Sequence, residues 1–418
     1  MAQTFWHPFA DMAWIQANGE LLLERGEGCY VWDADGTRYL DATASLWYCN
    51  VGWGRQEIGE AVAAQMATLP AYSAFGDFVT PVTLELADRV ASLAPFEDGK
   101  VFLTSGGSDS IDTATKMARR YWQLLDEPDR TILIRREKAY HGMHTAGTSL
   151  AGIPANAAGH GQLIEDVIEV PWDDADSLRA AIEDVGVERV AAFFCEPVIG
   201  AGGVFPPPDG YLEAARQVCR DAGALFVADE VITGFGRCGD WFASTRFALD
   251  PDIVVCAKGI TSGYLPLGAV LATPGVAAPF WAEGGGMWRH GYTYSGHAAV
   301  AAAALVNIDI LEREGLPARS REMEGVFLDA LKQLADHELV DDVRGGVGLL
   351  GAVALRHEAV AADPMLGIEV GGEARREGKV LIRPLVGGAL ALSPPLTISE
   401  AQIQEMVDGI RAGLDAVA

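Results

Sequence analysis

Two apolar segments each bring a chemically useful side chain to the end of a predicted strand. Lys258 follows the apolar residues 253–257, and Asp229 ends the apolar residues 225–229. A lysine partly buried at a sheet edge has a lowered pKa, so its neutral amine can form a Schiff base with an aldehyde. An acid at such an edge can face a pyridine nitrogen, bind magnesium or simply end a strand. The lysine can equally extend its charged end into solvent.

A third segment, around Gly107 and Ser108, predicts a phosphate-binding turn. The predicted strand at residues 100–104 leads into a glycine pair, and Ser108 opens a helix whose apolar residues recur every three or four positions. The free backbone amides of such a helix start bind phosphate well. Taken alone, this segment favours the simpler interpretation, in which Ser108 caps a core helix.

The three segments together favour one cofactor. Magnesium binding by Asp229 would require a GxxxxGK[ST] loop, and Gly99-Lys100 and Gly378-Lys379 are each followed by valine instead. A phosphate cradle, an amine that reaches an aldehyde and an acid that holds a pyridinium proton are what pyridoxal phosphate (PLP) requires. The sequence therefore predicts PLP chemistry.

Alternating strands and helices must position these residues. Continuous apolar runs are typical of strands covered on both faces, and helical spacing at residues 211–222 separates two of them. This pattern predicts an α/β sheet that is mainly parallel. Residues 20–41 predict short strands with a turn at Asp35-Gly36, and the chain after residue 307 predicts a helix, strands and a final helix from Ser399. The strands of the main sheet are predicted at residues 100–104, 131–134, 190–195, 225–229, 253–257 and 269–272.

Composition limits the possible functions. The chain has 418 residues, of which 50% are hydrophobic, and a net charge of −27. This acidity disfavours binding to nucleic acid or to anionic membrane surfaces. The longest apolar run, Ala298 to Val306, is about half of a membrane span, and no signal-like segment begins the chain. Six cysteines without a CxxC pair indicate reduced thiols and a cytoplasmic location.

With these motifs, the chain resembles the class III aminotransferases of PLP fold type I over essentially its whole length. The resemblance implies a mainly parallel mixed sheet covered by helices, and a smaller α+β domain built from both termini. It implies a division into residues 1–56 and 307–418 for the small domain and 57–306 for the large PLP-binding domain. The resemblance rests on the glycine-serine loop, Tyr140-His141-Gly142, Asp229-Glu230-Val231 and Lys258, in that order.

The resemblance also implies roles for single residues. Lys258 would link to the cofactor aldehyde and then move the substrate's α-proton, while Asp229 would pair with the ring nitrogen. Val231 would pack on one face of the ring and Tyr140 on the other, where Tyr140 also borders the substrate. For Tyr140 the alternative is a tyrosine that only packs in the core.

Further implied contacts concern the phosphate group and the partner subunit. Gly107 and Ser108 match the family's phosphate loop. Thr293 matches a threonine that reaches the phosphate from the neighbouring subunit, which implies a homodimer with shared active sites.

Substrate binding is implied for two segments. Arg383 matches a mobile arginine that binds a substrate carboxylate, and its alternative is a solvated arginine at a strand end. Trp47 and Tyr48 match an aromatic segment that lines the substrate pocket. Tyr72 and Phe75 are expected either to add to the pocket across a dimer or to pack in the core.

The implied reaction is a ping-pong transfer of an amino group from an ω-amino acid or amine to a keto acid such as pyruvate. Alternatives are a diaminopelargonate-type aminotransferase, a decarboxylase, an aminomutase or a PLP-binding regulatory protein. The first alternative arises because Trp6–Phe9 resembles the start of diaminopelargonate aminotransferases.

The GxGxxG pattern at residues 346–351 precedes a predicted strand rather than a helix, which disfavours a dinucleotide site. His141 and His144 form HxxH without an evident third ligand, so no metal site is predicted.

Overall fold

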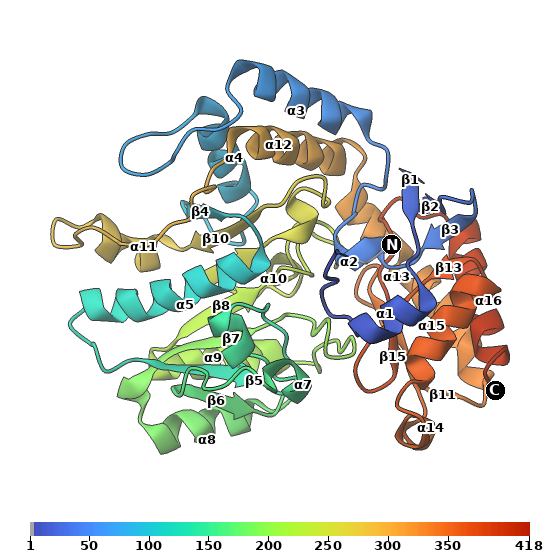
Figure 1. Cartoon of the computed structure of the whole chain (residues 1–418). Coiled ribbons are helices and arrows are strands. Elements are labelled where there is room, and N and C mark those ends of the chain that lie inside the picture. Colours follow the sequence, from blue (N-terminus) through green and yellow to red (C-terminus); the bar gives the residue numbers. More distant parts are fainter. Residues whose placement is uncertain (1–3) are drawn as a thin grey trace.

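A seven-stranded mixed sheet forms the centre of the computed structural model, which describes residues 4–418 (Figure 1). The strand order is β4-β10-β9-β8-β7-β5-β6, and β10 pairs antiparallel with both of its neighbours while the strands from β9 to β6 pair in parallel. The predicted mainly parallel sheet is therefore confirmed. The strands are β4 (Lys100–Thr104), β5 (Ile132–Arg136), β6 (Val167–Val170), β7 (Val190–Cys195), β8 (Leu225–Asp229), β9 (Ile253–Cys256) and β10 (Gly268–Ala272).

Six of these seven strands lie within one or two residues of their predicted positions. The seventh, β6, was not predicted, because Glu169 interrupts its short apolar run. This interruption is tolerated because β6 is the last strand of the sheet and pairs only with β5. Charged side chains are common on edge strands, where they hinder pairing with another chain.

Helices cover the sheet and form a separate layer above its β4 end (Figure 1). In that layer α12 packs on α3 and α4. The helices are α1 (Met12–Asn18), α2 (Ala44–Trp47), α3 (Gln56–Thr68), α4 (Pro81–Ala91), α5 (Gly107–Leu124), α6 (Thr145–Ser149), α7 (Pro154–Ala157), α8 (Ala175–Val185), α9 (Tyr211–Ala222), α10 (Ala243–Arg246), α11 (Pro274–Trp281), α12 (Ala298–Arg313), α13 (Leu316–Lys332), α14 (His357–Ala362), α15 (Leu366–Arg376) and α16 (Glu400–Asp415).

Both ends of the chain build the smaller part of the molecule. One sheet has the order β1-β2-β3-β13 and the other β11-β12-β15-β14, and β13 pairs in parallel with β3. The division at residues 56 and 306 stays a prediction, and α12 continues across the second position. The strands are β1 (Leu23–Glu27), β2 (Tyr30–Asp33), β3 (Arg38–Asp41), β11 (Val340–Arg344), β12 (Gly351–Leu355), β13 (Val380–Leu381), β14 (Arg383–Pro384) and β15 (Ala389–Leu392).

The GxGxxG pattern at residues 346–351 runs directly into β12. The strand predicted after this pattern is therefore confirmed, whereas a dinucleotide fingerprint opens a helix. The final helix also matches its prediction. Ser399 caps α16 in a reciprocal capping box with Gln402.

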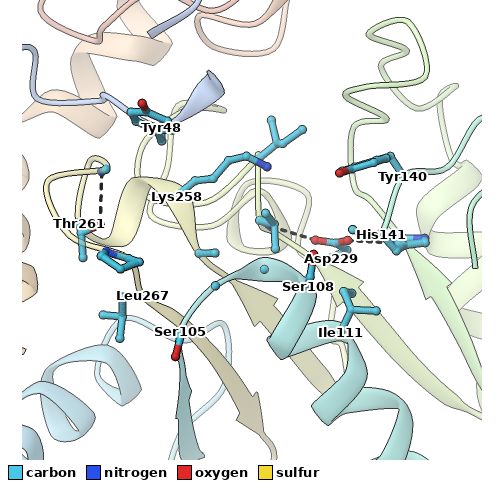
Figure 2. Close-up of a pocket in the computed structure, with 18 of the residues that line it drawn as sticks. Tyr48, Ser105, Ser108, Ile111, Tyr140, His141, Asp229, Lys258, Thr261 and Leu267 are labelled. Atoms are coloured by element: carbon cyan, nitrogen blue, oxygen red, sulfur yellow. Dashed lines mark hydrogen bonds and ion pairs between the residues drawn. The ribbon is translucent and has the colours of Figure 1, made fainter. Parts of the chain in front are cut away.

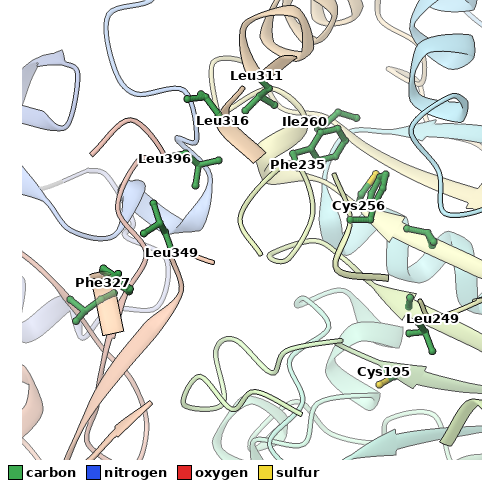
Figure 3. Packing of buried hydrophobic residues seen from close by; sticks show 14 of the residues in the cluster. Cys195, Phe235, Leu249, Cys256, Ile260, Leu311, Leu316, Phe327, Leu349 and Leu396 are labelled. Atoms are coloured by element: carbon green, nitrogen blue, oxygen red, sulfur yellow. The ribbon is translucent and has the colours of Figure 1, made fainter. Parts of the chain in front are cut away.

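One apolar core joins the large sheet to the C-terminal part of the chain. Buried residues run from Cys195 and Cys256 in the sheet through Ile260 to Leu316 and Leu396 (Figure 3). This continuity fixes the C-terminal strands relative to the carboxyl ends of β7 to β9. All six cysteines are buried with free thiols. Within residues 4–418, no helix is long and apolar enough to cross a membrane.

Candidate active site

A cavity of about 390 Å³ lies at the carboxyl ends of the parallel strands (Figure 2). Asp229 ends β8, Glu196 follows β7, and Lys258 follows β9 after one residue. Such an edge is where ligands bind in α/β sheets. The lining residues are Tyr48, Ser105, Gly106, Gly107, Ser108, Ile111, Tyr140, His141, Gly142, Glu196, Asp229, Val231, Ile232, Ala257, Lys258, Thr261, Gly263, Leu265, Pro266 and Leu267.

Lys258 opens the short 3-10 helix η2 (Lys258–Ile260) with a φ of +50°, which turns the chain sharply out of the strand. Its amine and the Tyr140 hydroxyl point toward one another from opposite sides of the cavity (Figure 2). Burial lowers the pKa of Lys258 to about 8, against the opposing effect of the nearby carboxylates of Asp229 and Glu196. A substantial fraction of this amine is therefore neutral near physiological pH, as attack on an aldehyde requires.

Asp229 is held by two hydrogen bonds. Its Oδ2 lies 2.7 Å from Nδ1 of His141, and its Oδ1 accepts from the backbone amide of Val231 at 3.0 Å. Both Asp229 and His141 are buried, so the orientation of the carboxylate is fixed. His141 is thus the hydrogen-bond partner of Asp229. His144 lies apart from this pair, against Asp109, and no cluster of metal-ligating residues occurs in the described part of the chain.

The glycine-serine turn does not form the helix cap that was the simpler expectation. Gly106 occupies the N-cap of α5 without a side-chain cap, and Ser108 lies inside the first turn. Its Oγ instead accepts from the backbone amide of Met143 at 3.1 Å. The first-turn amides of α5 lack partners within the helix, so they are free for an anion in the cavity.

The turn is packed so closely that two glycines are required. A Cβ on Gly142 would lie 2.5 Å from Oγ of Ser108, and the φ of Gly142 is +89°. A Cβ on Gly107 would lie 3.0 Å from Cγ1 of Val231. Any larger residue at these positions would therefore displace cavity-lining side chains.

Trp47 lies near both Lys258 and the predicted substrate arginine, Arg383, but does not itself line the cavity. Its buried ring lies 5.9 Å from Nζ of Lys258 and 5.0 Å from Cζ of Arg383. Arg383 lies on β14, is partly buried, and does not itself line the cavity. Burial lowers its pKa, while the nearby Tyr140 opposes the shift. Trp47 is therefore close to both the amine and the guanidinium.

Tyr48 lines the cavity beside Trp47, as expected. A Cβ on Gly263, whose φ is +75°, would lie 2.2 Å from Cδ2 of Tyr48, so this glycine leaves room for the ring. Three other predicted residues are not assembled into the cavity. Thr293, Tyr72 and Phe75 are exposed in the isolated chain and do not line it.

Glu196 is a cavity residue that the sequence analysis missed. It is buried, and its carboxylate accepts from the backbone amides of Tyr140 at 2.9 Å and Gly200 at 3.0 Å. Burial raises its pKa, while the neighbouring His141 opposes that shift. The available signal was its position directly after the apolar run at residues 190–195, which is the same pattern that identified Asp229.

The geometry fits PLP. A buried carboxylate, an amine with a lowered pKa and a helix start kept open by glycines all border one cavity. These three groups complement a ring nitrogen, an aldehyde and a phosphate, respectively. The fit involves Asp229, Lys258 and the Gly107-Ser108 turn.

Comparisons with known proteins agree with this geometry. Residues 14–414 match the profile of the family described as aminotransferase class-III. The chain is 38% identical to a putrescine–pyruvate aminotransferase of Pseudomonas aeruginosa over 98% of this chain and 94% of that protein. It is 34% identical to a β-alanine–pyruvate aminotransferase of the same organism, over 99% and 96%. A PLP-bound amine transaminase from an uncultivated Pseudomonas species superposes with a TM-score of 0.93 at 37% identity, covering 100% of both chains.

Proposed function

Because the chain belongs to the class III aminotransferases, we propose that it transfers an amino group from an ω-amino acid or amine to a keto acid such as pyruvate. PLP, the cofactor of this enzyme class, supplies an electron sink when bound. The observation that carries the proposal is the presence of Lys258 and Asp229 on one cavity.

The residues around the cavity have distinct roles in this proposal. Lys258 in its neutral form would hold the cofactor through its aldehyde and, once freed from it, would take the proton from the substrate carbon that bears the amine. Asp229, oriented by His141, holds the proton on the ring nitrogen. Tyr140 and Val231 are assigned to the two faces of the ring.

Phosphate binding is assigned to the first turn of α5. The backbone amides at Gly107 and Ser108 are the proposed donors, and the positive end of the helix dipole adds to the attraction. The net charge of −27 makes such local donors necessary, because the overall field of the protein repels anions.

The substrate class follows from the surroundings of Lys258. We assign the ring of Trp47, which lies near Lys258, as an aromatic wall of the substrate pocket, and Arg383, close to the same ring, offers two parallel donors to a carboxylate. The relatives named for putrescine and β-alanine share pyruvate as acceptor. We therefore assign the arginine to the keto acid and the aromatic wall to the chain of the amine donor.

We also propose a homodimer with shared active sites. Thr293 is exposed and outside the cavity of its own chain. Exposed aromatic side chains, including Tyr72, Phe75 and Tyr294, gather on neighbouring segments, since Phe75 lies against Gly291. Apolar surface of this kind is typical of an interface. A cytoplasmic location is proposed from the six free, buried thiols.

A panel of amine donors tests the proposed reaction. Purified holoenzyme is mixed with putrescine, β-alanine, an aromatic amine and glutamate, and the cofactor absorbance is followed before and after pyruvate is added. We expect the first three donors to change the absorbance and pyruvate to restore it. Reaction with glutamate alone would contradict the substrate assignment. Release of carbon dioxide without use of pyruvate would indicate a decarboxylase.

A further inference from the structure

The segment that carries Trp47 has a strained backbone. Three of the four residues of α2 have positive φ angles, namely Ala44 at +43°, Ser45 at +57° and Trp47 at +59°. None of them is glycine, and a side chain disfavours this backbone region. Interactions from outside the turn must therefore hold it in place.

The side chain of Asp41, which ends β3, supplies these interactions. Its Oδ1 accepts from the amide of Thr43 at 3.2 Å, and its Oδ2 accepts from the amide of Ser45 at 2.8 Å and from Nε1 of Trp53 at 3.0 Å. Asp41 is only 2% exposed, and no ion pair within residues 4–418 involves it. A buried carboxylate is thus held by neutral donors alone, and two of them are the backbone of the strained turn.

Asp41 also lies beside the segment that carries Arg383. It is paired in register with Leu381 of β13, and the amide of the next residue, Ala42, donates to the Leu381 carbonyl at 3.1 Å. Arg383 follows Leu381 by two residues. Trp47 and Arg383, the two side chains that we assign to substrate, therefore come from segments that meet at Asp41.

We propose that Asp41 is a positioning residue that holds the ring of Trp47 beside Lys258 and Arg383 and so sets the shape of the substrate pocket. The kinetic consequence of this inference depends on the proposed function. It does not involve the phosphate turn or Asp229, which belong to other elements. Asp41 should therefore affect substrate binding much more than cofactor binding.

The substitution Asp41→Asn tests this role with almost no change in size. The Thr43 hydroxyl also donates to Oδ1 of Asp41, at 3.1 Å. Each orientation of the amide places its NH₂ group against at least one N–H donor, so the turn loses a bond in either case. We expect the KM for amine and for pyruvate to rise about tenfold, while the affinity of the apoprotein for PLP changes less than about twofold. Amide hydrogen exchange in residues 42–48 should become faster.

Asp33→Asn is the matched control. Asp33 lies at the other end of the β2–β3 hairpin and also accepts from backbone amides, those of Asp35 and Thr37. Its substitution should alter local exchange near residue 35 and leave both KM values unchanged. Equal KM effects of the two variants would show a general loss of hairpin stability and would overturn the positioning role.

A double-mutant cycle separates action through Trp47 from a merely structural effect. In a Trp47→Ala background, Asp41→Asn should raise KM by less than about twofold, because the ring that it positions is gone. The full tenfold effect in that background would contradict the proposal, as would unchanged exchange in residues 42–48. A wild-type enzyme that fails to react with any amine would refute the proposed function instead, and the exchange experiment would still decide whether Asp41 orders the turn.

Discussion

Nδ1 of His141 lies 2.7 Å from Oδ2 of Asp229, and both side chains are buried. In such surroundings a hydrogen bond to a charged group is little weakened by water. The other ring nitrogen of His141, Nε2, has no hydrogen-bond partner within the described residues. Its bond to Asp229 is therefore the polar contact that fixes the ring, and the ring in turn fixes the carboxylate.

The substitution His141→Ala should reduce kcat/KM about 10- to 100-fold, which corresponds to the roughly 1.5–3 kcal/mol of a hydrogen bond to a charged group. The reason is that one oxygen of the buried Asp229 would lose its partner. Steady-state kinetics with saturating PLP measures the effect. His144→Ala makes the same chemical change three residues further on, where the side chain is exposed, and should leave kcat/KM nearly unchanged.

The pKa of Lys258 predicts how cofactor uptake depends on pH. Burial lowers this pKa from 10.5 to about 8, so the amine is mainly protonated below pH 8 and mainly neutral above it. Only the neutral amine attacks an aldehyde. The rate at which the apoprotein takes up PLP should therefore rise with pH and level off above about 8. A midpoint near the ordinary lysine value would contradict the burial effect.

Several residues that the sequence analysis singled out line one cavity because the signals that marked them are local. Lys258, Asp229 and the Gly107-Ser108 turn each follow an apolar run, and the carboxyl ends of neighbouring strands meet at one edge. The same rule identifies Glu196 in retrospect. It was overlooked because a single acid after a strand has no distinguishing neighbour in the sequence.

Other features depend on contacts between distant segments. No local pattern indicates that Asp41 holds the turn of Trp47, or that Arg383 lies close to that ring. The pairing of β3 with β13 joins residues that are more than 300 positions apart. Likewise, the helix cap was only the simpler interpretation of Ser108 taken alone, and the bond of Ser108 to the amide of Met143 depends on how the loop after β5 folds back onto α5.

The close packing of Gly142 against Ser108 predicts a defect in cofactor affinity. In Gly142→Ala the new Cβ would lie 2.5 Å from Oγ of Ser108, so the serine must move and the first turn of α5 is disturbed. We expect the Kd for PLP to rise about tenfold or more, measured by titration of the apoprotein. Gly159→Ala is the control. Its φ of +81° resembles the +89° of Gly142, but no atom lies within 4 Å of the new Cβ. Equal effects of both variants would assign the defect to backbone strain.

Arg383 should distinguish the two substrates. Arg383→Gln removes the charge and one of the paired donors, so the KM for pyruvate should rise about tenfold or more, while the KM for an amine without a carboxylate should change little. Arg383→Lys keeps the charge but cannot form two parallel bonds, and it should restore only part of the pyruvate affinity. An equal increase for both substrates would mean that Arg383 acts by supporting Trp47, which lies 5.0 Å away.

Mixed dimers can test whether Thr293 acts on the partner's site. Lys258→Ala removes the amine within one cavity, whereas Thr293→Ala would impair the cavity of the other chain. In a mixed dimer, one site then carries both changes and the other carries neither. Random reassociation of equal amounts should restore about a quarter of the wild-type activity, because half of the dimers are mixed and each has one intact site. Activity no higher than the mean of the two parent variants would show that Thr293 serves its own chain or no site at all. Size-exclusion chromatography of each variant must first show the same assembly as the wild type, because a dimer that fails to form would abolish the activity for a different reason.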